Sequence, residues 1–517
     1  MKTVTPPILP VLDAHQATRW DEAARHAGSP SRVLMESAGR GAAHILANIL
    51  GPRFDKGILV AAGHGNNGGD GWVIARALHA VDIPTWVVEY EKERSPDCEA
   101  NRALARSDGV TVLTPSETWP AVDVAVDALL GTGAVGKPRG EIADIAERLM
   151  RTNARVVAVD GPTGLDLTTG EPHGPVRADL TITFGGLRRG HLLRRDWCGR
   201  LMVLDIGFGR TPDGEHWPLL VDDDWACRVL PALDADAHKG KRGRVLIVGG
   251  EEGMAGAVHY AARAAFGAGA GLVRIATQFG SAAALQENFP DVTVIITMLA
   301  GALEDRVGEA LEWADAVVLG PGLGRGNERR AFVAEVLRRV KCPVLLDADA
   351  LHSGLETLQI GVASRVLTPH VGEFKASFPT ISGVDADRFG SVAEAANVVA
   401  GAKGTVLLKG VPTLIASRDQ TRVVASGNPG LATGGSGDVL SGIIGTFLAN
   451  GLSGLDAASL GAHALGRAAE VAAGRISVRS MRPTDVIHSL AEVWKGLAEP
   501  VYKEPPVMLD LRMPVLK

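Results

Sequence analysis

Short runs of apolar, β-branched residues that end in glycine or aspartate recur along this chain and alternate with longer segments of helical periodicity. Strands joined through helices in this way lie parallel in a sheet, with helices on its faces. The pattern therefore predicts an α/β fold built on parallel sheets. The expected strands of the first half are residues 57–62, 122–128, 155–159, 180–184 and 201–206. Those of the second half are residues 244–248, 272–276, 292–297, 316–319, 344–346, 365–367 and 406–408, followed by a hairpin of residues 413–416 and 422–425.

A stretch without periodicity separates the two sets of strands. It lies near residues 212–232 and contains turn-forming and acidic residues. A chain of 517 residues is too long for one compact core, so we expect one domain at residues 1–220 and another at residues 228–500. No internal repeat relates the two halves, which indicates a fusion of two unlike domains. We expect the first domain to be Rossmann-like. The proline-rich tail after about residue 499 is expected to form an extended arm.

Charge and cysteine content exclude several classes of protein. The net charge of -6 gives no general attraction to nucleic acid or to an anionic membrane, so anionic ligands need local binding features. The four cysteines form no CxxC pair, which argues against a disulfide framework and a zinc site. No apolar run reaches the roughly 18 residues of a membrane span, and the N-terminus lacks the apolar core of a signal peptide. We therefore expect a soluble cytoplasmic protein that binds neither nucleic acid nor membrane. A homo-oligomer is a separate expectation that these features do not address.

The run at residues 428–442, Asn-Pro-Gly-Leu-Ala-Thr-Gly-Gly-Ser-Gly-Asp-Val-Leu-Ser-Gly, carries the clearest chemical signal. Glycines let successive backbone N–H groups point at an anion, and the helix that follows adds the positive end of its dipole. Asp438 beside such an anion hole suits a general base that takes a proton from a substrate hydroxyl. For this run alone, the alternative is a glycine-rich turn with Asp438 as an ordinary helix cap.

A second glycine-rich loop, at residues 63–71, follows the first expected strand and precedes a helical pattern. Its amides can cradle a pyrophosphate, although the spacing differs from GxGxxG. Two asparagines and Asp70 add oxygen atoms that suit a hard cation or a polar substrate edge. Two further strands end in Asp127 and Asp160, and ligands of open parallel sheets bind at such strand ends. Taken singly, each aspartate has the alternative of a cap or turn former.

With five other blocks in the same order, the run at 428–442 resembles the ribokinase-like superfamily over roughly residues 230–495. The blocks are residues 238–240, 320–324, 346–351, 367–373 and 409–410, and they are similar to the dehydratases that repair hydrated NADH and NADPH. The resemblance implies that Asp438 is catalytic and that the hydrated nucleotide contacts Ala257, Gly322, His370 and Asp438. It places adenine nucleotide at Lys409, Gly410, Val411, Pro412, Thr413, Gly434, Gly435, Ser436 and Gly437. The residues themselves leave His370 open as a structural histidine and Lys409 as a surface lysine.

Roughly residues 10–215, through the loops above and the block at 34–39, resemble the NAD(P)H-hydrate epimerase family. The resemblance implies that Asp160 is catalytic and that potassium is held by Asn67, Asp127 and Thr163. The implied substrate contacts are Asn66, Asn67, Gly68, Gly69, Asp70, Gly131, Thr132, Gly133, Ala134, Val135, Gly136, Lys137 and Asp160. This sequence has Ser37 where the family usually has Asn and His64 where it usually has Pro, which puts the epimerase in question. Thr163 replaces the common Ser but keeps its hydroxyl.

Together the resemblances imply a bifunctional repair enzyme that interconverts the R and S hydrates and dehydrates the S hydrate. ADP, K⁺ and Mg²⁺ are the implied cofactors, and ADP is preferred to ATP on the resemblance alone. Asp347 and Asp349, at a strand end, could bind magnesium through water, although a structural role is the reading we favour. The alternatives are a ribokinase-like small-molecule kinase, for which Asp438 would serve equally well, and a nucleotide-sensing protein with one or both sites inactive.

Overall fold

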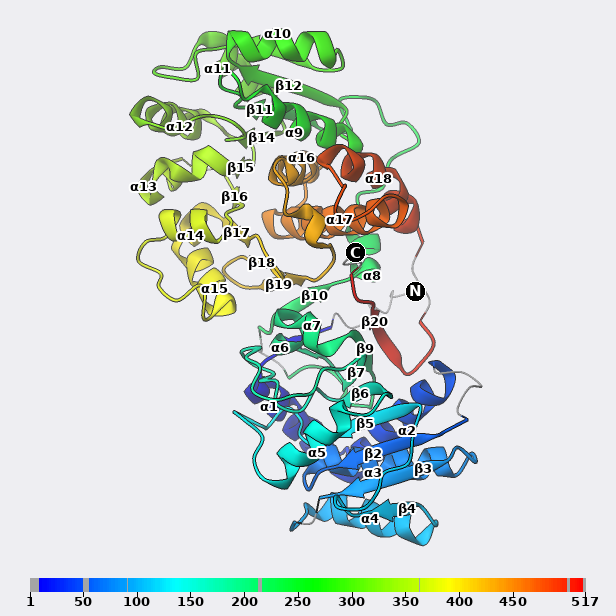
Figure 1. Ribbon diagram of the computed structural model, residues 1–517. Coiled ribbons are helices and arrows are strands. Elements are labelled where there is room, and N and C mark those ends of the chain that lie inside the picture. Colours follow the sequence, from blue (N-terminus) through cyan, green and yellow to red (C-terminus); the bar gives the residue numbers. More distant parts are fainter. Residues whose placement is uncertain are drawn as a thin grey trace. The chain divides into compact units, whose positions relative to one another are not determined.

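The structure is a computed structural model that describes residues 9–49, 55–90, 92–212, 216–361, 363–499 and 503–514. The chain divides into two compact units between Trp217 and Pro218, and a C-terminal strand returns to the first unit. Each unit contains a largely parallel sheet flanked by helices (Figure 1), which confirms the predicted α/β class. None of the helices in the described part of the chain has the length and hydrophobicity of a membrane span.

Eight strands form the main sheet of the first unit. They are β2 (Ile58–Ala62), β3 (Thr85–Glu89), β4 (Thr111–Leu113), β5 (Val124–Ala128), β6 (Arg155–Val159), β7 (Leu180–Phe184), β9 (Arg200–Leu204) and β20 (Val507–Leu511). Their order across the sheet is β20-β9-β7-β6-β5-β2-β3-β4, and only β20 is antiparallel to its neighbour. The chain proceeds outward from β2 in one direction and from β5 in the other. Loops diverge at such a switch point, which opens a crevice at the carboxyl ends of β2 and β5.

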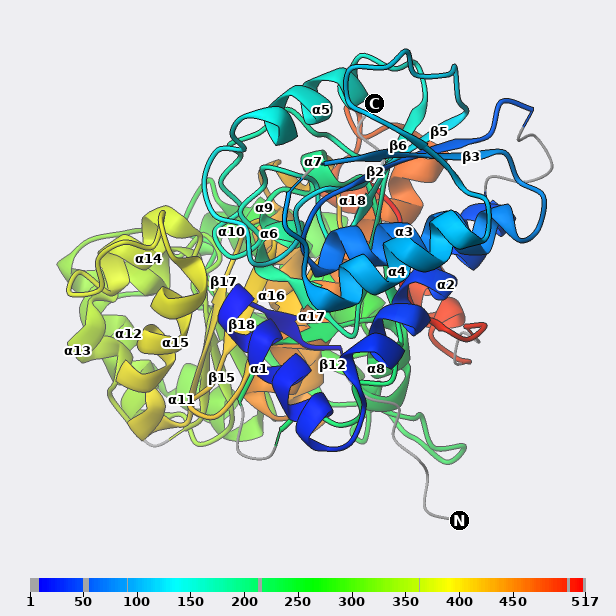
Figure 2. The same ribbon diagram turned by 90° about the horizontal axis from the view of Figure 1, so that it is seen from below.

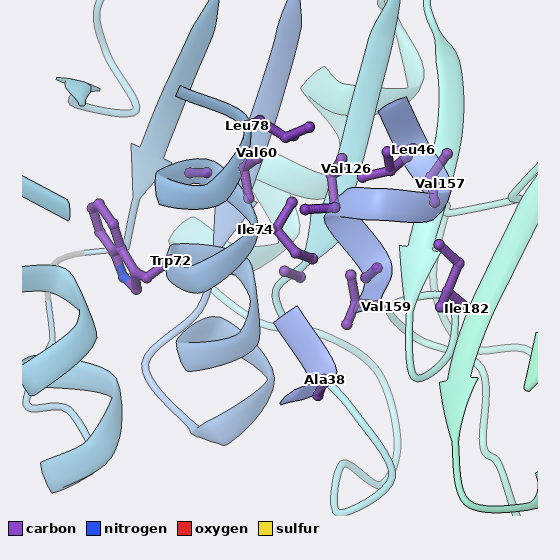
Figure 3. Close-up of a cluster of buried hydrophobic side chains, with 14 of the residues drawn as sticks. Ala38, Leu46, Val60, Trp72, Ile74, Leu78, Val126, Val157, Val159 and Ile182 are labelled. Carbon is purple, nitrogen blue, oxygen red and sulfur yellow. The ribbon is translucent and has the colours of Figure 1, made fainter. Parts of the chain in front are cut away.

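Successive side chains of each strand point to opposite faces of the sheet, so the core of this unit has two layers. Side chains such as Ile58, Val60 and Val126 pack with Trp72 and Ile74 on one face of the sheet (Figure 3). The intervening Leu59, Ala61 and Ala125 pack on the other face with the apolar side of a single helix. The helices of the first layer are α2 (Ser31–Ile49), α3 (Asn66–His79) and α4 (Pro96–Ser107), and that of the second is α5 (Glu141–Met150), seen across the sheet in Figure 2. The remaining elements are α1 (Ala14–His26), α6 (Arg189–Leu193), α7 (Arg195–Cys198) and the parallel pair β1 (Val11–Leu12) and β8 (Leu187–Arg188).

Ten strands form the sheet of the second unit. They are β10 (Leu219–Val221), β11 (Arg244–Val248), β12 (Leu272–Thr277), β13 (Thr293–Ile296), β14 (Ala316–Leu319), β15 (Val344–Leu346), β16 (Arg365–Leu367), β17 (Gly404–Leu408), β18 (Thr413–Ala416) and β19 (Thr421–Val424). Their order is β10-β19-β18-β17-β16-β15-β14-β11-β12-β13, with antiparallel pairing only between β17 and β18 and between β18 and β19. Here the chain diverges between β11 and β14, so a second crevice is expected at their carboxyl ends.

Helices cover both faces of this second sheet (Figure 1). One face carries α9 (Ala255–Gly267), α16 (Ser436–Ala449), α17 (Gly454–Arg475) and α18 (Pro483–Gly496), and the other carries α12 (Asn327–Arg339), α13 (Leu355–Leu358), α14 (Val371–Ser377) and α15 (Arg388–Val398). Further elements are α8 (Asp223–Val229), α10 (Phe279–Asn288), α11 (Asp305–Trp313) and the 3₁₀ turns η1 (Ala348–Ser353), η2 (Ala400–Ala402) and η3 (Pro429–Leu431). α16 is buried over most of its length because it packs against α9, α17 and the sheet. Its N-terminus therefore has a fixed position beside the second crevice.

The C-terminal tail differs from the predicted extended arm because it pairs with the sheet of the first unit. β20 binds the outer edge of β9, and the guanidinium of Arg200 donates to both carboxylate oxygens of Asp510 at 2.6 Å. Leu509 is buried against this edge. Short strands such as β3, β4 and β10 were also not predicted from the sequence.

Candidate active sites

A cavity of about 600 Å³ lies at the carboxyl ends of β2, β5 and β6 in the first unit. It is lined by eight of the predicted substrate residues, namely Asn66, Asn67, Asp70, Gly131, Thr132, Gly133, Ala134 and Asp160. Gly68 and Gly69 are buried in the first turns of α3 outside this lining. Val135 is 83% exposed, and neither it nor Gly136 nor Lys137 lines the cavity. The structure thus brings together the first part of the 131–137 loop, the asparagines and the strand-end aspartate.

The loop after β2 depends on glycine where it meets the loop after β5. A Cβ atom at Gly63 would lie 2.0 Å from the carbonyl oxygen of Leu129, and one at Gly68 would lie 2.0 Å from the carbonyl oxygen of Gly63. Any other residue would force these backbone segments apart. Asn66 and Asn67 consequently begin α3 at the mouth of the crevice.

Asp160 is held by donors on every side. Its Oδ2 accepts from the backbone N of Thr132 at 2.7 Å and from the Thr132 hydroxyl at 2.5 Å, and its Oδ1 accepts from Thr183 and Arg188. Burial alone would raise the pKa of this carboxyl, but Arg188 and the Thr132 hydrogen bonds outweigh it and lower the pKa. His191 bonds through Nε2 to the carbonyl of Asp160, at 2.7 Å, and burial lowers the pKa of His191 to about 4. Asp160 therefore remains ionised.

Of the three residues predicted to hold potassium, Asn67 lines this cavity, whereas Asp127 and Thr163 are fully buried outside its lining. Asp127 is fully buried at the end of β5, where Thr163 donates to it from its backbone N and its hydroxyl, both at 2.7 Å. Burial raises the pKa of Asp127 to about 6 despite these bonds. Both polar atoms of the Asn67 side chain are buried and have no hydrogen-bond partner in the described part of the chain. The unpartnered oxygen of Asn67, the carboxylate of Asp127 and the hydroxyl of Thr163 are all oxygen donors, the kind that a hard cation prefers.

Two positions depart from the usual pattern of the epimerase family that this half resembles, and only one of them lines the cavity. Ser37 lies on α2 and does not line the cavity, whereas His64 lines it. The His64 ring packs edge-on against Tyr90 at 5.5 Å between ring centres, and its Nδ1 has no partner among the described residues. Burial, with Lys92 and Arg94 nearby, lowers the pKa of His64, so its ring stays neutral.

The second unit has a pocket of about 320 Å³ at the carboxyl ends of β11 and β14. Gly253, Met254, Gly256, Ala257 and Tyr260 line it from the β11 side, with Gly322 from β14 and Gly435 and Asp438 from α16. Three of the four predicted dehydratase contacts, Ala257, Gly322 and Asp438, thus share this pocket.

Gly435 shapes the turn at the predicted anion hole. It has a φ of +96°, and a Cβ atom there would lie 2.8 Å from the Tyr260 ring. The chain can therefore turn sharply into α16 with the backbone N–H groups of its first residues exposed to a ligand. The hydroxyl of Ser436, in that first turn, is buried and has no partner within the described residues.

Asp438 is the third residue of α16 and is mostly buried at the pocket. Burial raises its pKa to about 7, and the carboxylate of Asp347 adds to the effect while Lys409 opposes it. A carboxylate whose pKa lies near neutrality is suited to accept a proton from a hydroxyl. This position follows from the motif at residues 428–442 without any long-range information.

Lys409 is part of a buried polar network. Its Nζ lies 3.0 Å from Oδ1 of Asp347 and 3.5 Å from Glu373, and these charges outweigh burial and raise the pKa of Lys409. Asp347 also accepts from the hydroxyls of Thr368 at 2.9 Å and Ser441 at 2.6 Å. A Cβ atom at Gly437 would lie 3.6 Å from Lys409 Nζ, which places this ammonium group at the anion hole. Thr368 lies in the block at residues 367–373 and Ser441 in the run at residues 428–442, but neither was predicted to contact Asp347.

His370 caps a helix and does not line the pocket. Its Nδ1 accepts from the backbone N of Gly372 and Glu373, and its own backbone N donates to the Glu373 carboxylate at 2.9 Å. Capping is thus one role of His370, and the substrate contact implied by the resemblance stays a prediction. Gly410, Val411 and Pro412 lie in the turn between β17 and β18, and Thr413 begins β18. Arg388 donates to the carbonyls of Lys409 and Val411 in this turn. Val411 is 74% exposed, so this turn is accessible to a ligand.

Asp347 and Asp349 do not form a preformed magnesium site. Asp347 is occupied by Lys409, Thr368 and Ser441, and Asp349 accepts from the backbone N of Gly324 and from Arg325. Within the described residues no group of three or more His, Cys, Asp or Glu side chains is arranged to hold a metal ion. Both carboxylates therefore already have protein hydrogen-bond partners, and their binding of magnesium through water stays a prediction.

Both halves of the chain match known families. Residues 245–492 match the family described as NAD(P)H-hydrate dehydratase, and residues 31–190 match the family described as YjeF-related protein N-terminus. The chain is 38% identical over 447 residues to the bifunctional NAD(P)H-hydrate repair enzyme Nnr of Escherichia coli (strain K12), with 84% of each chain covered. It is 36% identical over 503 residues to the enzyme of the same name from Moorella thermoacetica, covering 91% of this chain and 94% of the relative.

Solved structures resemble the second half. A hypothetical protein from Streptococcus mutans is 24% identical, with a TM-score of 0.50 over 54% of this chain and 100% of that chain, and it supports the fold alone. An ADP/ATP-dependent NAD(P)H-hydrate dehydratase from Bacillus subtilis, co-crystallised with ATP and Mg²⁺, is 28% identical, with a TM-score of 0.48 over 53% of this chain and 97% of that chain.

Proposed function

The chain belongs to the bifunctional NAD(P)H-hydrate repair enzymes, which combine an epimerase and a dehydratase domain, and from this premise we propose how its residues perform the two reactions. The observation that carries the proposal is Asp438, a carboxyl whose pKa is raised to about 7 beside the glycine-rich start of α16. The second unit dehydrates the S hydrate with an adenine nucleotide. The first unit supplies that epimer from the R hydrate.

Dehydration starts with the hydroxyl that hydration has placed on the reduced nicotinamide ring. Asp438 takes the proton of this hydroxyl, whose oxygen attacks the terminal phosphate of the nucleotide. The phosphate ester leaves far more easily than hydroxide does. Elimination of phosphate, with loss of a ring proton and help from the lone pair of the ring nitrogen, restores NADH or NADPH. With ADP the other products are AMP and phosphate.

The nucleotide phosphates fit the start of α16. The backbone N–H groups of residues 434–437 and the unpartnered hydroxyl of Ser436 offer donors to the charge that develops during transfer. Lys409 adds a fixed positive charge beside them. The accessible turn at residues 410–413 would hold the rest of the nucleotide, and we retain ADP as the co-substrate. Magnesium would accompany the phosphates, because it keeps several waters and needs few protein ligands.

The first unit binds the hydrate in its 600 Å³ cavity, with the asparagine loop, residues 131–134 and Asp160 as contacts. Asn67, Asp127 and Thr163 would hold potassium, which offsets the buried charge of Asp127 and orders the loop above it. A cytoplasmic location and a homo-oligomeric assembly stay predictions, which cell fractionation and sedimentation test.

Purified S hydrate tests the dehydratase assignment. Incubated with the protein, ADP and Mg²⁺, it should yield NADH, AMP and phosphate in equal amounts. A stable phosphorylated product without NADH would instead identify a small-molecule kinase. Loss of potassium from the buffer should slow epimerisation of the R hydrate while dehydration of the S hydrate proceeds.

A further inference from the structure

Three carboxylates face the cavity of the first unit, and their surroundings differ. Asp160 accepts hydrogen bonds from Thr132, Thr183 and Arg188, as described above. Asp21, on α1, forms an ion pair with Arg25 at 3.0 Å. Asp70, on α3, lines the same cavity, yet no donor among the described residues hydrogen bonds to its carboxyl group. One of the three carboxyls is thus left for a ligand.

We propose that Asp70 is the proton-transfer residue of the epimerase, giving a proton to the hydroxyl of the bound hydrate and taking one back after the configuration has inverted. The proposal rests on the epimerase function of the first unit. It assigns to Asp160 a different role, that of a permanently ionised group which binds substrate and stabilises positive charge.

The chemistry balances without any further reactant. Hydration of the reduced nicotinamide leaves the hydroxyl on the carbon next to the ring nitrogen. The Asp70 proton moves to this hydroxyl, the C–O bond breaks with its electron pair on the departing water, and the nitrogen lone pair forms a C=N⁺ bond. Water then attacks the opposite face of the same carbon, the C=N⁺ electron pair returns to nitrogen, and the surplus proton returns to the Asp70 carboxylate. One water leaves and one enters, so the enzyme ends in its starting state.

The electrostatics of the cavity favour this division of roles. Burial, together with the charges of Asp160 and Asp21, raises the pKa of Asp70 well above its ordinary range. Asp160, in contrast, has a lowered pKa and stays charged. Two carboxyls whose surroundings drive their pKa values apart are suited to act as a proton donor and as a charge stabiliser. The other titratable or charged groups around Asp70 are Arg25, His64, Cys98 and Arg188, and burial keeps Cys98 neutral by raising its pKa to about 12.

The test compares three variants of the full chain with purified R hydrate, subtracting the rate measured without enzyme at each pH. Asp70→Asn keeps the size and the hydrogen-bonding ability of the side chain but has no transferable proton. We expect kcat to fall by about 10²- to 10⁴-fold while KM changes much less. Asp82→Asn, exposed beyond the end of the same helix, should stay within about 2-fold of the parent because it lies outside the cavity. Asp160→Asn should also lower the rate, because it removes the ionised group that binds substrate and stabilises positive charge.

The pH profile separates the two aspartates. Because the proposal requires protonated Asp70, the parent kcat should decline as pH rises through the pKa of Asp70, and Asp70→Asn should lack this decline. Asp160→Asn should retain it. A folded Asp70→Asn protein with near-parental kcat overturns the proposal, and so does loss of the decline in Asp160→Asn.

If Asp70→Asn fails to fold, as judged by thermal unfolding, the pH profiles of kcat for the parent and for Asp160→Asn test the proposal instead. A parent profile that is flat between about pH 5 and pH 9 contradicts a proton donor with a raised pKa. A parent protein that leaves R hydrate unchanged at every pH would contradict the epimerase function itself, which is a distinguishable result.

Discussion

Replacing Asp438 by Asn should abolish dehydration and stabilise the second unit at the same time. Asparagine keeps the shape of the side chain but cannot accept the hydroxyl proton. Loss of a positioned general base costs on the order of 10²- to 10⁴-fold in rate, or roughly 3 to 5 kcal/mol. Nucleotide affinity should change far less, because the phosphate contacts are backbone N–H groups of residues 434–437 that the substitution leaves in place.

The stability gain follows from the pKa of Asp438. A rise from the ordinary 3.8 to about 7 means that folding disfavours the ionised form by up to about 4 kcal/mol. In the parent this penalty is absent below about pH 4, grows as pH rises toward 7 and is complete above it. Asp438→Asn removes the penalty, so its advantage in unfolding free energy should be greatest above pH 7 and vanish near pH 4. The parent dehydration rate should rise through about pH 7, since the base must be ionised.

The assay combines denaturant unfolding at several pH values, ADP binding by calorimetry and the rates of both reactions. Asp305→Asn serves as the matched control, because Asp305 is an acidic residue in the first turn of α11 and is exposed. It should change neither rate. If Asp438→Asn binds ADP yet dehydrates within a few-fold of the parent rate, Asp438 is only a helix residue and the reasoning is wrong.

Three further predictions concern other parts of the molecule. Asp127→Asn should abolish the potassium dependence of epimerisation. In the parent that dependence should weaken below about pH 6, where Asp127 takes up a proton. Equal epimerisation rates in potassium and in a bulky organic cation would remove the ion from the mechanism. Lys409→Met should raise the KM for ADP and lower the free energy of unfolding of the second unit by roughly 3 to 5 kcal/mol. The reason is that Asp347 would keep its buried charge and lose its cation. Calorimetric unfolding and ADP titration measure the two effects. Ending the chain at Glu499 should lower the melting temperature of the first unit, since the edge of β9 loses β20 and Leu509; an unchanged melting curve would show that this pairing contributes nothing.

Much of the chemistry was predictable because it is encoded locally. The glycines at 434–437 and Asp438 are adjacent in sequence, so the proposed anion hole and its proposed base follow from one run of residues. The same holds for the strand-end positions of Asp127 and Asp160, because parallel strands collect their carboxyl ends at one edge of a sheet.

Features that depend on distant contacts were not predictable. Arg188 reaches Asp160 from β8, a two-residue strand that pairs with the distant β1, and no local sequence pattern predicts that pairing. His370 could be a ligand or a cap, and the choice depends on the backbone N–H groups that its ring meets after folding. β20 lacks a clear alternation of apolar and polar residues. It forms a strand by pairing with β9, some 300 residues earlier in the chain.

The central claim is that one chain restores both epimers of hydrated NADH. The most direct measurement is the recovery of reduced-nicotinamide absorbance from an equilibrium mixture of R and S hydrates with ADP, Mg²⁺ and K⁺. The account predicts complete recovery by the parent, recovery of little beyond the S share by Asp70→Asn, and no recovery by Asp438→Asn. Absence of recovery by the parent with either ADP or ATP would contradict it.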